Sequence, residues 1–289
     1  MTSIVSWNIQ YGKAADGRID LARIRQALEA WSLADVICFQ EVSDGFGDLG
    51  PGAEDDQPGL ITGLFPEYRP VFRPAIEWRS ASGRMRRFGN MILSRLPVLE
   101  ITSHMLPRPA DAEVKHMRRQ VLEVVVESGA GPLRVATTHL EYYSPTQRAA
   151  QVGRLLELVK EWEEEAARPA MAGLATYEAR PRPIGSVLCG DFNFVPDDDA
   201  YGRIVAARDE GRLFDAWPLV DAGRPHRPTC GLFDRKQWPQ GPHARDFFFV
   251  CRELAPAVAA LETQTETDAS DHQPVRLRLR HARSGYRMV

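Results

Sequence analysis

The chain has 289 residues, of which 44% are hydrophobic and 26% charged, and its formal net charge is −3. That composition is typical of a globular protein, and the length suits one large core or two modest domains. Proteins that live on duplex DNA usually carry a basic excess, because phosphate contacts supply most of their non-specific affinity. The composition therefore permits a nucleic-acid substrate without favouring one.

Targeting signals and disulfides are not expected. No segment approaches the roughly twenty apolar residues of a membrane helix, so we predict no membrane span. The N-terminus, Met1–Asn8, has neither a basic nor an apolar leader region, which favours a cytoplasmic protein. The cysteines lack C-x-x-C spacing and most lie in apolar runs, which predicts buried free thiols instead of a zinc site or a disulfide; they are Cys38, Cys189, Cys230 and Cys251.

Short apolar runs bounded by turn residues predict β-strands along most of the chain. Several of these runs are rich in Val, Ile and Phe, which favour strands. The predicted strands are Ser3–Ile9, Asp35–Gln40, Tyr68–Phe72, Gly89–Ser94, Val98–Met105, Gln120–Glu127, Leu133–Thr138, Ser186–Cys189, Asp246–Val250 and Pro274–Arg280.

Helices are predicted at three places between these strands. Asp20 is placed to cap the first helix and Ser144 the second, and both residue types accept hydrogen bonds from the first turn. The helices are Leu21–Trp31, Pro145–Ala167 and Asp198–Arg208, and the long loops are Asp44–Pro58 and Arg168–Pro183. Because the pattern does not change across either loop, we predict a single α/β domain over residues 1–289.

Polar residues stand at the ends of several predicted strands. Ligands of open α/β sheets bind outside strand ends, so side chains at these positions can converge. The polar positions are found in Trp7-Asn8, Gln40-Glu41, Thr138-His139, Gly190-Asp191-Phe192-Asn193 and Ser270-Asp271-His272.

Each of these residues alone has an ordinary structural interpretation. Asn8, Asp191 and Asn193 could form turns, Glu41 could be a solvated acid, and the two histidines could be structural. Together they form the inventory of a phosphoryl-transfer site. Carboxylate and amide oxygens suit Mg²⁺ or Mn²⁺, and histidine exchanges protons with oxygens around phosphorus.

The order of these motifs closely resembles the endonuclease/exonuclease/phosphatase superfamily, which includes the DNase I-like nucleases. The resemblance runs from Asn8 to His272, and Gly-Asp-Phe-Asn together with Ser-Asp-His carries most of its specificity. It is extended by Gly89-Asn90-Met91-Ile92-Leu93-Ser94-Arg95 and Arg245-Asp246-Phe247-Phe248. The resemblance implies a four-layer α/β/β/α sandwich, with two facing mixed β-sheets and the site between them at one end.

The resemblance also implies a metal site and an attacking water. Glu41 would be the principal ligand of Mg²⁺ or Mn²⁺, with Asn8 and Asp271 close to the ion. Asp191 would position or activate the water. These roles suit phosphoryl transfer, because a cation spreads the charge that develops on the equatorial oxygens.

The remaining catalytic positions implied by the resemblance concern the phosphate and a proton. Asn193 and His139 would hold the non-bridging oxygens, and Asp246 would orient His272. A carboxylate beside histidine favours the imidazolium. The chain departs from the family's Arg-x-Asp-Tyr pattern, because Arg245 directly precedes Asp246, and this shift leaves the role of Arg245 open.

Two features bear on the substrate. An Arg-rich stretch spans residues 69–87, and its Arg84 and Arg87 are weak candidates for substrate contacts. Such a stretch would attract phosphate groups, but it could equally form solvated hairpin tips. Trp238 could form a substrate wall, or it could be a rigid edge packed on the sheet.

These features predict a divalent-metal-dependent phosphoesterase that hydrolyses a phosphodiester, in nucleic acid or in a small molecule, by in-line water attack. One alternative is a phosphomonoesterase acting on a phosphorylated metabolite or lipid headgroup. Another is an inactive binding protein on the same scaffold, which is disfavoured because every expected polar position is present. The sequence indicates a phosphoester substrate and no protein partner. It does not identify the substrate, the number of metal ions or the oligomeric state.

Overall fold

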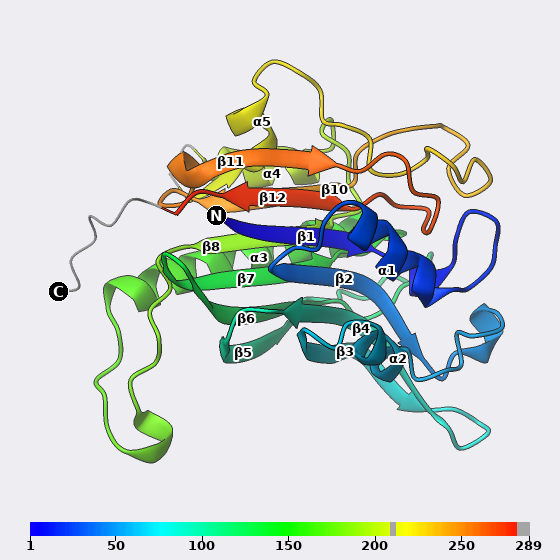
Figure 1. The fold of residues 1–289 in the computed structure, drawn as a ribbon, viewed down its shortest axis with the longest axis horizontal. Helices are drawn as coiled ribbons and strands as arrows, with labels where there is room; N and C mark the ends of the chain where they lie inside the picture. The colour runs from blue at the N-terminus through cyan, green and yellow to red at the C-terminus, as the bar shows by residue number, and fades with distance from the viewer. Residues whose placement is uncertain (209–211, 282–289) are drawn as a thin grey trace.

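The computed structural model describes residues 1–208 and 212–281, and Figure 1 presents its fold. The strands within them form two six-stranded sheets, with the orders β11-β12-β1-β2-β4-β3 and β5-β6-β7-β8-β10-β9. Their bounds are β1 Thr2–Asn8, β2 Val36–Asp44, β3 Arg69–Arg79, β4 Met85–Ser94, β5 Val98–Met105, β6 Gln120–Ser128, β7 Gly131–His139, β8 Ser186–Asp191, β9 Leu213–Asp215, β10 Asp246–Cys251, β11 Val258–Thr263 and β12 Val275–Leu279. Both sheets are mixed, because β1 pairs with β2 and β7 with β8 in parallel, whereas the other neighbours are antiparallel.

Helices cover the outer face of each sheet (Figure 1). The helices α1 (Leu21–Ala30) and α2 (Gln57–Leu64) pack on the first sheet, and α3 (Pro145–Ala167) and α4 (Asp199–Ala206) pack on the second. A short helix, α5 (Ala216–Val220), contacts β9, β10 and β11. No helix among the described residues is both long and apolar enough to cross a membrane.

The inner faces of the two sheets share one core. Ile4 and Cys38 of the first sheet pack with Val135, Val187 and Phe248 of the second. Alternate residues of the same strands, such as Val5 and Phe249, point outward to the helices, as the two-residue repeat of a strand requires. The four-layer α/β/β/α sandwich with two facing mixed sheets is therefore confirmed. The four cysteines are buried and free, as predicted.

The predicted elements are present, but several have other bounds. The third helix is shorter than Asp198–Arg208, because Asp198 is its cap and accepts a hydrogen bond from the amide of Ala200. The predicted strands Tyr68–Phe72 and Gly89–Ser94 extend into a long hairpin, β3–β4, and the predicted loop 44–58 contains the start of α2. Among the α-helices and strands of the described residues, those not predicted are α2, α5, β9 and β11.

The inner faces become polar toward one end of the sandwich. Along β1 the inward positions run from Ile4 through Ser6 to Asn8, and along β8 they run from Val187 to Asp191. The parallel pairs bring the carboxyl ends of β1, β2, β7 and β8 to this same end. The strand pattern itself therefore opens a polar site between the sheets at the end of an otherwise apolar core.

Candidate active site

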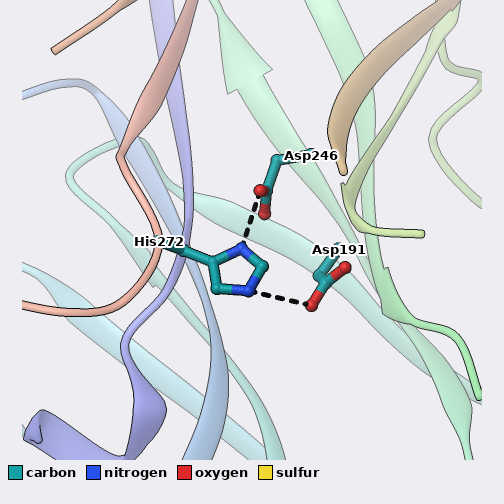
Figure 2. Close-up of side chains that lie close together, drawn as sticks. All are labelled: Asp191, Asp246 and His272. Atoms are coloured by element: carbon teal, nitrogen blue, oxygen red, sulfur yellow. Dashed lines mark hydrogen bonds and ion pairs between the residues drawn. The ribbon is translucent and has the colours of Figure 1, made fainter. Parts of the chain in front are cut away.

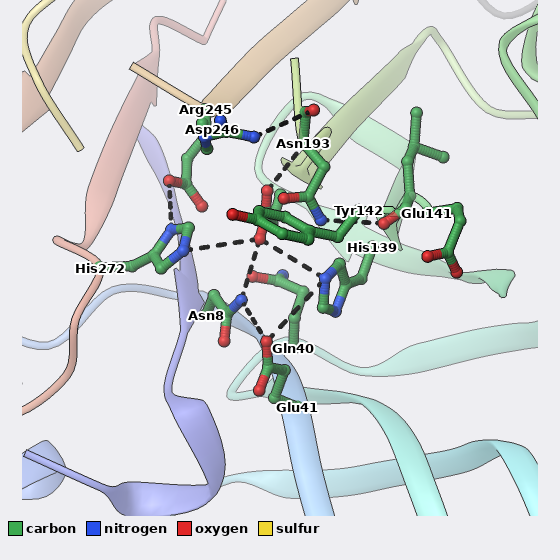
Figure 3. Close-up of polar contacts among 12 residues, drawn as sticks. Asn8, Gln40, Glu41, His139, Glu141, Tyr142, Asn193, Arg245, Asp246 and His272 are labelled. Carbon is green, nitrogen blue, oxygen red and sulfur yellow. Dashed lines mark hydrogen bonds and ion pairs between the residues drawn. The ribbon is translucent and has the colours of Figure 1, made fainter. Parts of the chain in front are cut away.

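The eight predicted catalytic and metal-binding side chains lie together at the polar end of the sandwich, and Figure 3 shows the contacts among most of them. Asn8, His139, Asp191 and Asp246 stand at strand ends, and Glu41 lies within β2. Asn193 lies in the loop after β8, and Asp271 and His272 lie in the loop before β12. Local backbone geometry tightens the arrangement. Gly190 has a φ of +143°, and a side chain there would collide with the carbonyl oxygen of Thr138 on the neighbouring strand. Glycine thus allows β7 and β8 to approach closely beside the site.

Glu41 and Asn8 form one side of the site. A β-bulge between Phe39 and Val42 interrupts the pairing of β2 with β4, and Glu41 there has a left-handed φ of +60°. Strained residues of this kind cluster at functional sites because the surrounding structure must hold them. The amide of Asn8 donates to Glu41 Oε1 over 2.9 Å, while Asn8 Oδ1 accepts from the backbone of Gln10 over 3.0 Å. These contacts hold the Asn8 amide in one orientation, with its nitrogen toward Glu41 and Asp191.

Asp191 is the centre of the cluster. Its Oδ2 accepts from Asn8 Nδ2 over 2.9 Å and lies 3.5 Å from His139 Nε2 and 3.7 Å from His272 Nε2. Burial alone would raise the pKa of Asp191, but nearby His272 and His139, with the hydrogen bonds from Asn8 and the Asn193 backbone, together outweigh it and hold the pKa below its ordinary value. Asp191 is therefore a carboxylate that already faces several hydrogen-bond donors.

The two histidines have opposite electrostatic surroundings. Burial and the charge of Arg119 hold the pKa of His139 well below 6.5, so His139 is neutral at pH 7. Burial also acts to lower the pKa of His272, but the negative charges of Asp246, Asp191 and Asp271 and the hydrogen bond to Asp246 together outweigh it, and the pKa is raised well above 6.5. His272 is therefore a cation at neutral pH.

Asp246 orients His272, as Figure 2 shows. His272 Nδ1 lies 2.8 Å from Asp246 Oδ2, and both side chains are buried. Thr229 holds the start of β10 in place, because its Oγ1 accepts from the backbone amide of Asp246 over 3.1 Å. Trp7 donates its indole N–H to the carbonyl of His272 over 2.9 Å and fixes the main chain behind the ring.

Asn193 follows Asp191 in a second left-handed conformation, with φ +52°. Its backbone amide donates to Asp191 Oδ1 and its side-chain amide donates to the carbonyl of Leu140, each over 2.9 Å. These bonds hold the Asn193 amide between Asp191 and the strand that carries His139. The side-chain amide retains a second N–H for a ligand.

Asp271 is held by the residue that we considered as a substrate wall. Trp238 Nε1 donates to Asp271 Oδ2 over 3.1 Å, and the indole ring packs edge-on against His272. Only 2% of Trp238 is exposed, so its ring has no open face for a substrate in this structure. Of the two interpretations left open, the packed edge describes its position.

Arg84 and Arg87 are not part of the eight-residue cluster. They lie on the β3–β4 hairpin and both pair with Asp44, the last residue of β2: Arg87 Nε is 2.7 Å from Asp44 Oδ2 and Arg84 Nη2 is 3.7 Å from Asp44 Oδ1. Arg86 of the same hairpin pairs with Asp48. Nearby carboxylates therefore offset much of the positive charge that the sequence suggested for this edge.

The donor set fits a hard divalent cation. Burial and the charge of Asp271 raise the pKa of Glu41 to about 7, and burial raises the pKa of Asp271 as well. Neighbouring carboxylates with raised pKa values are groups that a cation would stabilise in their charged form. Asp191, Asp246 and His272 also have ligand atoms within 4.8 Å of one another. Because His272 and Asp246 already bind each other, Asn8, Glu41 and Asp271 are the better candidates for metal ligands.

Two further residues around the site were given no role from the sequence, although Gln40 stands in one of the polar motifs. Arg119 contacts Glu141 through Nε over 3.2 Å, and its Nη1 is buried without a hydrogen-bond partner among the described residues. It lines a pocket together with Glu41 and His139. Gln40 crosses between the sheets and donates to Thr137 Oγ1 over 2.8 Å. Their polar character inside or beside apolar runs was the sequence signal for them.

Comparison with solved structures identifies similar folds. An endonuclease/exonuclease/phosphatase from Beutenbergia cavernae is 24% identical with a TM-score of 0.69, over 96% of this chain and 72% of that one. A mannosyl-6-phosphatase from Bacteroides thetaiotaomicron is 18% identical with a TM-score of 0.66, over 96% and 99%. The 3′ phosphatase NExo from Neisseria, bound to a product DNA hairpin, is 18% identical with a TM-score of 0.62, over 96% and 99%.

Sequence comparison gives the family. Comparison with curated protein sequences finds no match. The model of the Endonuclease/Exonuclease/phosphatase family, however, matches residues 5–272, which include seven of the eight clustered residues between its limits and His272 at its end. The match covers most of the chain and agrees with the two-sheet fold and the motif order. The chain therefore belongs to the Endonuclease/Exonuclease/phosphatase family.

Proposed function

We propose that this protein is a divalent-metal-dependent phosphoester hydrolase that acts by in-line attack of water. The observation that carries the proposal is the position of Asp191. Its buried carboxylate lies within 3.7 Å of a charged imidazole, within 3.5 Å of a neutral one and within 2.9 Å of an amide that also binds Glu41. Members of this family are hydrolases of phosphoesters, and this arrangement suits that chemistry.

Asn8, Glu41 and Asp271 would hold Mg²⁺ or Mn²⁺. The bound cation would supply charge neutralisation for the phosphoryl oxygens. The raised pKa of Glu41, about 7, follows from its burial and from Asp271 and is consistent with a ligand that exchanges a proton for a metal ion.

The remaining residues would divide the reaction between them. Asp191 orients the attacking water and accepts its proton, for which a carboxylate of lowered pKa is available in the charged form at neutral pH. The free N–H of Asn193 and the imidazole of His139 donate to the non-bridging oxygens. The imidazolium of His272, held by Asp246, faces the charge that develops during phosphoryl transfer.

Arg119 would add a further donor to the phosphate. Its side chain is 6% exposed, its Nη1 is buried without a hydrogen-bond partner among the described residues, and it lines the pocket beside Glu41 and His139. An unsatisfied buried guanidinium N–H costs free energy that a phosphate oxygen would recover.

A small phosphoester is the favoured substrate class within this proposal. Arg84, Arg86 and Arg87 are each paired with a carboxylate of residues 44–48. Duplex DNA is held mainly by cations that are free to meet its phosphates, and this hairpin offers few. The small substrate would be a phosphodiester or, as the second candidate, a phosphomonoester. Two structurally similar proteins, a mannosyl-6-phosphatase and a 3′ phosphatase, are named as phosphatases, which supports that second candidate.

A substrate panel tests the proposal. The panel contains bis-p-nitrophenyl phosphate, p-nitrophenyl phosphate, sugar and inositol phosphates, sphingomyelin, RNA and DNA, each with Mg²⁺, Mn²⁺ or EDTA. We expect turnover that requires metal, disappears in Glu41→Gln and persists in the matched control Glu157→Gln, whose carboxylate is exposed on α3. No metal-dependent turnover of any substrate by folded protein would refute the proposal and revive the inactive-scaffold alternative.

A further inference from the structure

Arg245 occupies an unusual place beside the site. It directly precedes Asp246, and its guanidinium carbon lies 4.9 Å from the centre of the Trp238 ring and 5.4 Å from that of Tyr142. The two rings themselves are in edge contact, with centroids 6.0 Å apart. Arginine binds aromatic faces through its planar, weakly hydrated guanidinium group. Arg245 is thus a cation held against two aromatic rings, instead of a solvated side chain.

The nitrogen atoms of Arg245 have directed partners. Nη1 donates to the backbone carbonyl of Asn193 over 3.1 Å, a contact drawn in Figure 3, and Nε donates to His243 Nε2 over 2.9 Å. His243 can accept there because its Nδ1 lies 2.7 Å from the carbonyl of Gly241 and therefore carries the proton. The guanidinium is fixed in orientation by these two bonds in addition to the rings.

These contacts reach two groups of the proposed reaction. Asn193 has a left-handed backbone, with φ +52°, and its carbonyl is held by Arg245 while its amide binds Asp191. Trp238, which Arg245 contacts on its ring, donates to Asp271 over 3.1 Å. A change at Arg245 would release the main chain at Asn193 and loosen the ring that holds Asp271.

We infer that Arg245 is a positioning residue that fixes the Asn193 amide, and secondarily Trp238, for the reaction. The inference rests on the proposed function, since it assigns Asn193 to the phosphate. It also explains the position of the arginine in this chain: placed next to Asp246, its side chain reaches the loop after β8, while the following carboxylate reaches His272. Two adjacent residues, Arg245 and Asp246 at the start of β10, thereby serve both sides of the site.

Kinetics with bis-p-nitrophenyl phosphate and Mg²⁺ test the inference. Arg245→Met should lower kcat by about 10- to 100-fold, as loss of such supporting contacts commonly does, with KM little changed. The effect should not add to that of Asn193→Ala, so the double variant should be no slower than Asn193→Ala alone. Added guanidinium ion at millimolar concentration should raise kcat of Arg245→Ala. Losses of kcat that are fully additive in the double variant, or a rise in KM with kcat unchanged, would overturn the inference.

Arg95→Met is the matched control. Arg95 also lies over one aromatic ring, 5.4 Å from the centre of Tyr68, and donates to a backbone carbonyl, that of Leu33, over 2.9 Å. It follows the last residue of β4, at the end of the sheet away from the site. This variant should keep wild-type kcat and should not respond to guanidinium. A loss of kcat in it equal to that in Arg245→Met would assign the effect to general destabilisation and overturn the inference.

A crystal structure of Arg245→Met separates this inference from the proposed function. We expect the Asn193 carbonyl to move and its left-handed φ to be lost, whether or not the wild-type protein hydrolyses the substrate. An Asn193 backbone that keeps its position in the variant would refute the positioning role even if the hydrolase activity is real. Absence of metal-dependent hydrolysis in the wild type would instead refute the proposed function alone.

Discussion

Replacing Asp246 by Asn should shift the pH dependence of the reaction. His272 Nδ1 lies 2.8 Å from Asp246 Oδ2, and the negative charges of Asp246 and Asp191 hold the pKa of His272 well above 6.5 against the effect of burial. Because the imidazolium form takes part in the proposed reaction, activity should fall as the pH rises through this pKa. Asn keeps an oxygen at hydrogen-bond distance but removes the charge.

The size of the shift follows from the geometry. Two unit charges about 4 Å apart at an effective dielectric constant of about 20 interact by about 4 kcal/mol, which corresponds to about 3 pH units as an upper value. An adjacent opposite charge typically shifts a pKa by about 1 to 3 units. We therefore expect the alkaline limb of the kcat profile of Asp246→Asn to move down by about 1 to 3 pH units. A bound cation lowers the pKa of His272 in both proteins and leaves the sign of the difference unchanged.

The assay is the pH profile of kcat with saturating Mg²⁺ for the wild type and Asp246→Asn. Near neutral pH, kcat of the variant should be lower by about 10²- to 10⁴-fold. The matched control is Asp215→Asn, because Asp215 forms a second, part-buried pair, 2.7 Å from His226 Nε2, outside the site. Coincident alkaline limbs in the wild type and Asp246→Asn, or an equal shift in the control, would refute the reasoning.

Three further predictions concern the metal and the phosphate. Burial and Asp271 raise the pKa of Glu41 from 4.5 to about 7, so the contribution of Glu41 to metal-free stability is complete below pH 4.5 and is lost as pH rises through 7. Urea titration should therefore find the metal-free wild type less stable at pH 8 than at pH 6. This difference between the two pH values should be much smaller in Glu41→Gln. Trp238→Phe should weaken Mn²⁺ binding by about 10-fold in calorimetry, because Asp271 loses a donor; unchanged affinity would contradict this. Arg119→Met should raise KM for phosphoesters without abolishing metal binding, and an unaltered KM would exclude its contact with substrate.

The two-residue repeat of the strands made much of the site predictable. Asn8 and Asp191 end strands that are largely apolar, and the sequence placed both among the polar residues at strand ends that can converge. The repeat could not predict the bulge that gives Glu41 its left-handed backbone, because bulges depend on pairing with β4. Nor could it predict that Arg87 pairs with Asp44, since that contact depends on the same pairing across 43 positions.

The fold was less predictable where strands lie at sheet edges. The predicted strand Tyr68–Phe72 stops before Pro74, and proline cannot donate to a sheet. In the structure β3 is an edge strand, where proline is tolerated, and it continues to Arg79. The strand β9 has only 3 residues, Leu213–Asp215, too few to give a recognisable pattern. Pairing with neighbouring strands determines both the length of β3 and the presence of β9.

The measurement that tests the account most directly is hydrolysis of bis-p-nitrophenyl phosphate in oxygen-18 water, with product analysis by mass spectrometry. Water oriented by Asp191 and attacking phosphorus should place the label in p-nitrophenyl phosphate, only when Mg²⁺ or Mn²⁺ is present, and Asp191→Asn should abolish the labelled product. Label in p-nitrophenol, or labelled product that forms equally in EDTA or in Asp191→Asn, would contradict the account.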